Sequence, residues 1–145
     1  MRILDIIRGT TVDGEGFRTA IYMAGCNHHC PGCHNPGSWD FEGGRDMSLE
    51  EIMEIVDEEE FDVTLSGGDP FCNVDDSLRL AREIRKRGYN IWCYTGYTIE
   101  EIRNDPALAP LLEEINVLVD GPFIRDLHDP DLLFRGSSNQ RIIRL

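Results

Sequence analysis

Three cysteines stand close together near the start of the chain. Cys26, Cys30 and Cys33 form a C-x3-C-x2-C pattern. Three thiolates in so short a stretch can converge on one point when they bind a soft metal, and iron-sulfur clusters are the natural candidate. A four-iron cluster with three cysteine ligands has one iron without a protein ligand, and that iron can bind a substrate. The pattern therefore predicts an iron-sulfur centre with one open coordination position.

A structural zinc site is the competing interpretation of the same cysteines. Such a site needs a fourth ligand, for which His28, His29 and His34 are available. Structural zinc sites usually combine two separated ligand pairs, however, and the remaining Cys72 and Cys93 are single cysteines that are most simply small buried hydrophobic residues. Five cysteines, of which three are clustered, also disfavour a disulfide framework and agree with a reducing compartment.

A second segment that could bind a ligand is Ser66-Gly67-Gly68-Asp69-Pro70, directly after a predicted strand at 61–65. Paired glycines let the backbone approach a ligand closely, and Asp69 offers a carboxylate to an ammonium group. Taken alone, the segment is more typical of a simple strand-to-helix turn. In combination with the cysteines it favours a ligand site.

The elements that must position these residues alternate along the chain. Apolar and β-branched residues predict strands at 2–8, 18–24, 61–65, 90–94 and 115–119. Capping boxes at Ser48/Glu51 and Thr98/Glu101 predict helix starts, and Asn73 is expected to cap a helix that ends at Gly88. A further short helix is expected within 107–114.

This alternation predicts an α/β fold with a parallel sheet and right-handed crossovers. A chain of 145 residues has room for about five βα units of ~30 residues, too few for a closed eight-stranded barrel. We therefore expect one domain over residues 1–145, built as a partial, laterally open (βα) barrel. The cysteines would follow the carboxyl end of a strand, where such folds place their chemistry.

The composition narrows the class of partner. A formal net charge of −13 argues against a nucleic-acid partner, which usually selects a basic surface. No apolar run approaches the ~20 residues of a membrane span, and the first residues lack the apolar core of a signal peptide. The expected location is the cytoplasm, without a membrane partner.

Several motifs together resemble a known family. The cysteine pattern is that of the radical S-adenosylmethionine enzymes, and the stretch 25–35 resembles the activating enzymes of glycyl-radical enzymes. The segments 13–16, 66–70, 119–121 and 135–140 are similar to those of the activators of anaerobic ribonucleoside-triphosphate reductase. The resemblance covers nearly the whole chain.

The resemblance implies a reaction and its cofactors. Cys26, Cys30 and Cys33 would hold a 4Fe-4S cluster whose fourth iron is chelated by S-adenosylmethionine. Reductive cleavage would give a 5'-deoxyadenosyl radical that abstracts hydrogen from a glycine of the reductase. The electron would come from a low-potential donor such as a flavodoxin or ferredoxin. The alternatives are an activase of a formate-lyase type enzyme, or a zinc or iron-sulfur binding module without catalysis.

The resemblance also implies contacts to S-adenosylmethionine. The residues concerned are Gly32, Cys33, His34, Ser66, Gly67, Gly68 and Asp69. Gly32 stands where many members have an aromatic residue that contacts adenine, so backbone groups of Gly32 and His34 would replace it. Asp69 stands where members often have Glu. Asp120 is expected to line the site, the segment 135–140 to contact the site or the partner, and Arg18 to serve either as an ion-pair partner or as a cofactor contact.

Overall fold

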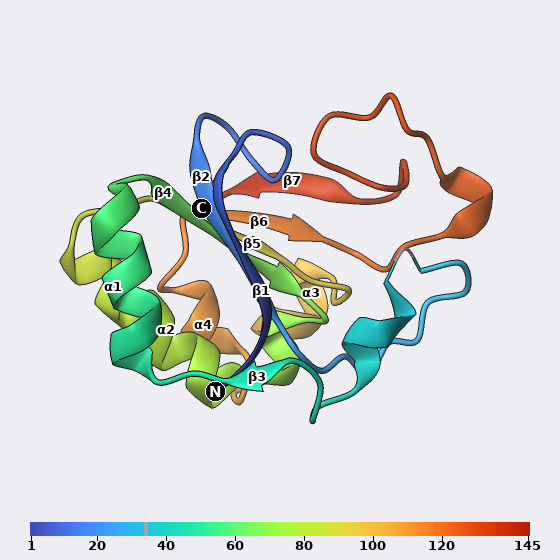
Figure 1. Ribbon diagram of the computed structural model, residues 1–145. Coiled ribbons are helices and arrows are strands. Elements are labelled where there is room, and N and C mark those ends of the chain that lie inside the picture. Colours follow the sequence, from blue (N-terminus) through green and yellow to red (C-terminus); the bar gives the residue numbers. More distant parts are fainter. Residues whose placement is uncertain (34) are drawn as a thin grey trace.

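The structure is a computed structural model that describes residues 1–33 and 35–145 (Figure 1). Within these residues, seven strands form one sheet in the order β3-β1-β2-β4-β5-β6-β7. The strands are β1 (Arg2–Thr10), β2 (Arg18–Met23), β3 (Arg45–Asp46), β4 (Asp62–Gly67), β5 (Ile91–Tyr94), β6 (Val117–Asp120) and β7 (Arg141–Arg144).

Four neighbouring strands, β2, β4, β5 and β6, are parallel, as the alternation of strands and helices predicts. The flanking strands differ from this expectation, because β1 pairs antiparallel with β2 and β7 pairs antiparallel with β6. The connection 11–17 between β1 and β2 is shorter than the dozen or so residues that a parallel crossover needs. Strand β7 was not predicted. The sheet therefore has a parallel centre and antiparallel edges.

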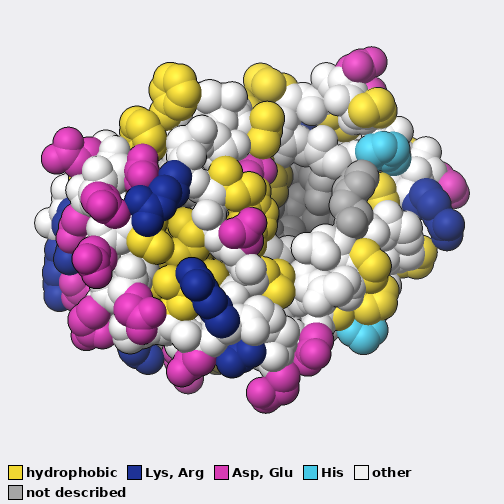
Figure 2. Space-filling model, viewed as in Figure 1, with side chains coloured by type: hydrophobic (Ala, Val, Ile, Leu, Met, Phe, Trp, Pro, Cys, Tyr) yellow, Lys and Arg dark blue, Asp and Glu magenta, His cyan; other side chains and the backbone are white. Residues whose placement is uncertain are grey.

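The helices are α1 (Leu49–Glu59), α2 (Val74–Lys86), α3 (Ile99–Arg103) and α4 (Ala109–Leu112), with short 3-10 turns η1 (Pro36–Trp39), η2 (Pro70–Cys72) and η3 (Arg125–Leu127). All four α-helices contribute side chains to one buried cluster against the sheet. Burial of such apolar side chains is the main stabilising contribution to the fold. Acidic and basic side chains gather over the outer faces of α1 and α2 (Figure 2).

Local capping explains where two helices begin. The Ser48 side chain accepts from the N–H of Glu51, the Glu51 side chain accepts from the N–H of Ser48, and Thr98 and Glu101 repeat this arrangement, so both predicted capping boxes are confirmed. Asn73 occupies the N-cap position of α2, as predicted, but its side chain does not cap the helix. Its side chain makes no cap hydrogen bond and instead donates to the carbonyl of Ala24 at 2.7 Å, which ties the start of α2 to the chain that leaves β2.

Arg18 lies buried at the amino end of β2. Its guanidinium donates to the Thr64 hydroxyl and to the carbonyls of Glu15, Val63 and Asn90, and it lies over the Trp92 ring. Burial lowers its pKa. Arg18 thus holds neighbouring strands together at the amino end of β2, opposite the carboxyl end from which the chain runs on to the cysteines. Within the described chain, no helix has both the length and the apolar character needed to cross a membrane.

Candidate functional site

The loops that leave the carboxyl ends of the parallel strands meet at one edge of the sheet, as expected for this kind of fold. A cavity of ≈ 240 Å³ lies there. Its lining includes all three clustered cysteines and the second predicted segment, namely Cys26, Cys30, Cys33 and residues 66–69. The chain after β5 and the chain after β6 also contribute to the wall. The two motifs that the sequence singled out, about forty residues apart, thus line one site.

Backbone hydrogen bonds join the cysteine loop to the 66–69 segment. The N–H of Gly68 donates to the carbonyl of Met23 at 2.7 Å, and the N–H of Asp69 donates to that of Gly25 at 2.8 Å. A Cβ on Gly67, whose φ is +110°, would lie 2.3 Å from backbone atoms of Met23, and a Cβ on Gly68 would lie 2.3 Å from the carbonyl oxygen of Gly25. The paired glycines are therefore required for the contact between the two loops.

The Asp69 carboxylate connects the site's loops. Only 1% of the residue is exposed, and its Oδ1 accepts from the N–H of Phe71 at 2.9 Å. Its Oδ2 accepts from the Thr95 hydroxyl and the Gly96 N–H, each at 2.9 Å, and lies 2.6 Å from His28 Nε2. Both oxygens thus already bind protein groups. We interpret Asp69 as a residue that positions the 66–69 segment, the chain after β5 and the cysteine loop.

His28 lines the cavity, although the sequence indicated it only as one of three histidines available to a zinc site. The side chain is half-buried, with its ring edge-on to Tyr97 at 4.5 Å between centroids. The hydrogen bond to Asp69 raises the pKa of His28, against the opposing effect of burial. A Cβ on Gly96 would lie 2.6 Å from the His28 ring. In contrast, His29 stacks on Trp39.

The cysteine side chains differ in their surroundings. Cys26 is buried, whereas Cys30 and Cys33 are partly exposed. A hydrogen bond with the Cys72 thiol, together with the backbone at His28, lowers the pKa of Cys26 to about 6 although burial opposes this, and burial raises the pKa of Cys30. Three sulfur donors lining one cavity, one of them stabilised as a thiolate, are a donor set that suits an iron-sulfur cluster.

Cys72 does not behave as the sequence suggested. It is only half-buried and its sulfur lies beside that of Cys26, so the expectation of a small buried hydrophobic residue is wrong for this cysteine. Cys93 does meet that expectation, because it is fully buried on β5 and its burial raises its pKa well above the usual value. No sequence pattern could have paired Cys72 with Cys26, because their approach depends on the register of β2 and β4.

The remaining expected site residues fall in different places. Gly32 is not among the residues that line the cavity, and a Cβ there would contact the Arg125 side chain. His34 lies outside the described residues. Asp120 is fully buried and does not line the cavity. Its carboxylate accepts from the N–H of Ile99 and from the Arg141 guanidinium, which fixes the start of α3.

The C-terminal segment 135–140 does reach the site. Gly136 and Gln140 line the cavity, next to Gly121 and Phe123 from the chain after β6. The Gln140 amide donates to the carbonyl of Gly121 at 3.0 Å and its oxygen accepts from the N–H of Gly136 at 2.9 Å. This side chain therefore holds the segment against the chain after β6 at the wall of the cavity.

A family model and a solved structure define the general class of this protein. The family model described as "4Fe-4S single cluster domain" matches residues 12–143. Among solved structures, QueE from Escherichia coli is similar in fold, with a TM-score of 0.55 and 16% sequence identity over 81% of this chain and 68% of that chain. The class is thus an α/β protein with a 4Fe-4S single cluster domain.

Curated relatives define the family more narrowly. The sequence is 39% identical to a protein of Escherichia coli strain K12 over 92% of each chain, and 35% identical to one of Haemophilus influenzae over 99% of this chain and 98% of that protein. A protein of Enterobacteria phage T4 is 30% identical over 90% of this chain and 86% of that protein. All three are named anaerobic ribonucleoside-triphosphate reductase-activating protein. The chain belongs to this family.

Proposed function

We propose that this protein activates an anaerobic ribonucleoside-triphosphate reductase by radical chemistry at a 4Fe-4S cluster. The observation that carries the proposal is the shared cavity. All three cysteines of the triplet line it, together with the glycine-rich 66–69 segment. Three thiolates leave one iron free for another ligand. The names of the curated relatives support the choice of partner.

The residues that would hold the two cofactors divide into two groups. Cys26, Cys30 and Cys33 would bind the cluster, and residues 66–69, which line the same cavity, would bind S-adenosylmethionine. When bound, the reduced cluster would supply the electron for cleavage of S-adenosylmethionine to methionine and a 5'-deoxyadenosyl radical, and this radical would take a hydrogen atom from a glycine of the reductase.

The protein's own contribution is positioning and exclusion of water. Asp69, which holds three loops at the cavity, would keep the 66–69 segment and the cysteine loop at a constant separation. Phe123 and Gln140, which form part of the cavity wall, would restrict access to it. Limiting access in this way would protect a reactive radical from side reactions.

The same proposal covers the surroundings of the site. The sheet would act as a partial, laterally open barrel within one domain, and its open side would admit the glycine-bearing loop of the reductase. A flavodoxin or ferredoxin in the cytoplasm would supply the electron. The segment 135–140, of which Gly136 and Gln140 line the cavity, would contact the partner.

The test replaces Cys30 with alanine. After anaerobic reconstitution, we expect the Cys30→Ala variant to lose the four-iron content, the electron paramagnetic resonance signal of the reduced cluster and the glycyl radical on the reductase. Cys93→Ala is the matched control, because Cys93 lies in the core outside the cavity, and it should retain all three. A glycyl radical produced by Cys30→Ala, or S-adenosylmethionine that leaves the spectrum of the wild-type cluster unchanged, would contradict the proposal.

A further inference from the structure

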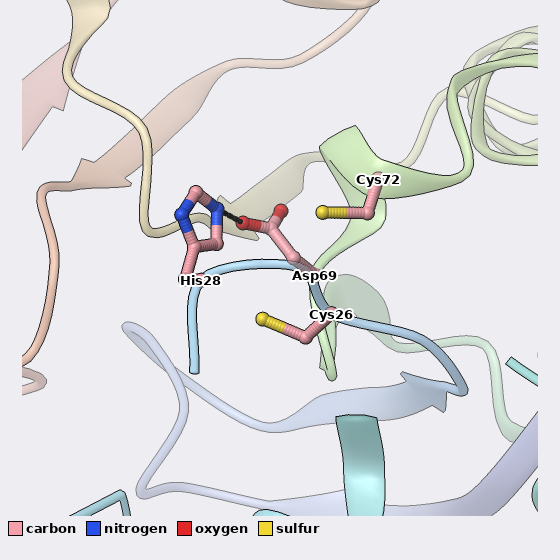
Figure 3. A group of neighbouring side chains, drawn as sticks. All are labelled: Cys26, His28, Asp69 and Cys72. Carbon is pink, nitrogen blue, oxygen red and sulfur yellow. Dashed lines mark hydrogen bonds and ion pairs between the residues drawn. The ribbon is translucent and has the colours of Figure 1, made fainter. Parts of the chain in front are cut away.

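Four side chains with metal-binding atoms converge beside the cysteine triplet. The sulfur atoms of Cys26 and Cys72, a ring nitrogen of His28 and a carboxylate oxygen of Asp69 all lie within 4.8 Å of one another. Figure 3 shows them gathered around a common space, two from the cysteine loop and two from the chain that follows β4. The group includes only one cysteine of the triplet.

This donor set suits zinc. Two thiolates, one imidazole and one carboxylate are the ligand types of tetrahedral Zn²⁺, with bond lengths of about 2.0–2.3 Å that place the donor atoms about 3.5 Å apart. To reach that geometry, separations near the upper limit of 4.8 Å need to contract by roughly 1 Å, and the 2.6 Å hydrogen bond between His28 Nε2 and Asp69 Oδ2 has to open. Cys72 can supply the movement, because it is half-buried at the end of the short turn η2.

The other ligands are already held in place. The Thr95 hydroxyl and the Gly96 N–H orient Asp69 Oδ2, and the Tyr97 ring supports the His28 ring. Hydrogen bonds and packing contacts that orient the ligands in this way strengthen metal binding. A surface hollow lined by Cys72, Asp75 and Asp76 gives access from solvent, and its two carboxylates favour the approach of a cation.

We propose that the cluster-free protein binds one Zn²⁺ through Cys26, His28, Asp69 and Cys72. Because Cys26 would serve both metals, bound zinc excludes the 4Fe-4S cluster. This second statement rests on the proposed function, whereas zinc binding itself does not.

The test uses the full-length, tag-free chain, stripped of iron and kept reduced without oxygen. It is titrated with CoCl2, to record thiolate-to-cobalt absorption, and then with ZnCl2 in competition with a chelating dye. Wild type should bind one equivalent with the spectrum of a tetrahedral site that contains two thiolates. Cys72→Ser should weaken binding at least about 100-fold, while Cys33→Ser, which removes a cysteine of the triplet outside the group, should bind zinc as wild type does.

The outcomes separate the two statements. If Cys33→Ser loses zinc as strongly as Cys72→Ser, the metal occupies the cluster site and the proposal is wrong; a wild-type protein without stoichiometric binding would also overturn it. His28→Gln provides a second ligand variant, and far-UV circular dichroism checks that each variant is folded.

The exclusion of the cluster by zinc is tested separately. Zinc-loaded wild type should take up iron and sulfide only after the zinc is removed by a chelator, whereas Cys72→Ser should take them up with zinc present. Uptake of four irons with zinc retained would refute exclusion alone.

Discussion

Replacing Asp69 with asparagine tests whether this buried carboxylate holds the site together. The amide oxygen can keep the three donors that meet Oδ2, but its NH2 group then faces the N–H of Phe71, which loses its acceptor. An orphaned buried N–H costs about 1–3 kcal/mol, and the hydrogen bonds that remain lose the contribution of the negative charge. We expect Asp69→Asn to lower the free energy of unfolding by about 3 kcal/mol.

The measurement is urea denaturation of the cluster-free protein, with equal slopes required for comparison of the free energies. Asp131→Asn makes the same chemical change at an exposed position and should stay within about 0.5 kcal/mol of wild type. A loss below about 1 kcal/mol in Asp69→Asn, with the slope unchanged, would show that the four donors do not need a charged acceptor. The interpretation of Asp69 as the residue that joins the loops would then fail.

Two further predictions concern the loops and the C-terminal strand. Gly67→Ala should lower the free energy of unfolding by about 3 kcal/mol or more and reduce iron uptake, because its Cβ would meet the backbone of Met23. Gly88 has a similar positive φ but open space around it, so Gly88→Ala should lower the free energy of unfolding by only about 1–2 kcal/mol. Urea denaturation measures both. Glu100→Gln should lower the melting temperature at pH 7, since Arg141 lowers the pKa of Glu100 to about 2. Because the folded pKa lies below the unfolded value of about 4.5, this stabilisation is present above pH 4.5 and is lost as the pH falls toward 2. The difference in melting temperature between Glu100→Gln and wild type should shrink over that interval and in high salt. A difference in melting temperature that does not change with pH would show that the ion pair with Arg141 is not its cause.

Interactions between residues close in sequence explain much of what could be predicted about the fold. A capping box involves residues three apart, so the helix starts after Ser48 and Thr98 follow from sequence alone. Asn73 shows the limit of the same rule. Its side chain could have capped α2, but the carbonyl of Ala24 lies within reach in the folded protein and takes its hydrogen bond. Strand β7 was missed because 141–144 is short and partly exposed, and it joins the sheet only by pairing with β6.

The candidate site divides in a similar way. The spacing of Cys26, Cys30 and Cys33 by itself indicated a centre with three thiolates, since their approach depends only on a short loop. The parallel register of β2 and β4 decided the rest, because it brings residues about forty positions apart to one edge. That register brings His28 within hydrogen-bonding distance of Asp69 and places Cys72 beside Cys26. Sequence separation sets contacts within a loop, whereas contacts between loops exist only once the sheet has aligned the strands that carry them.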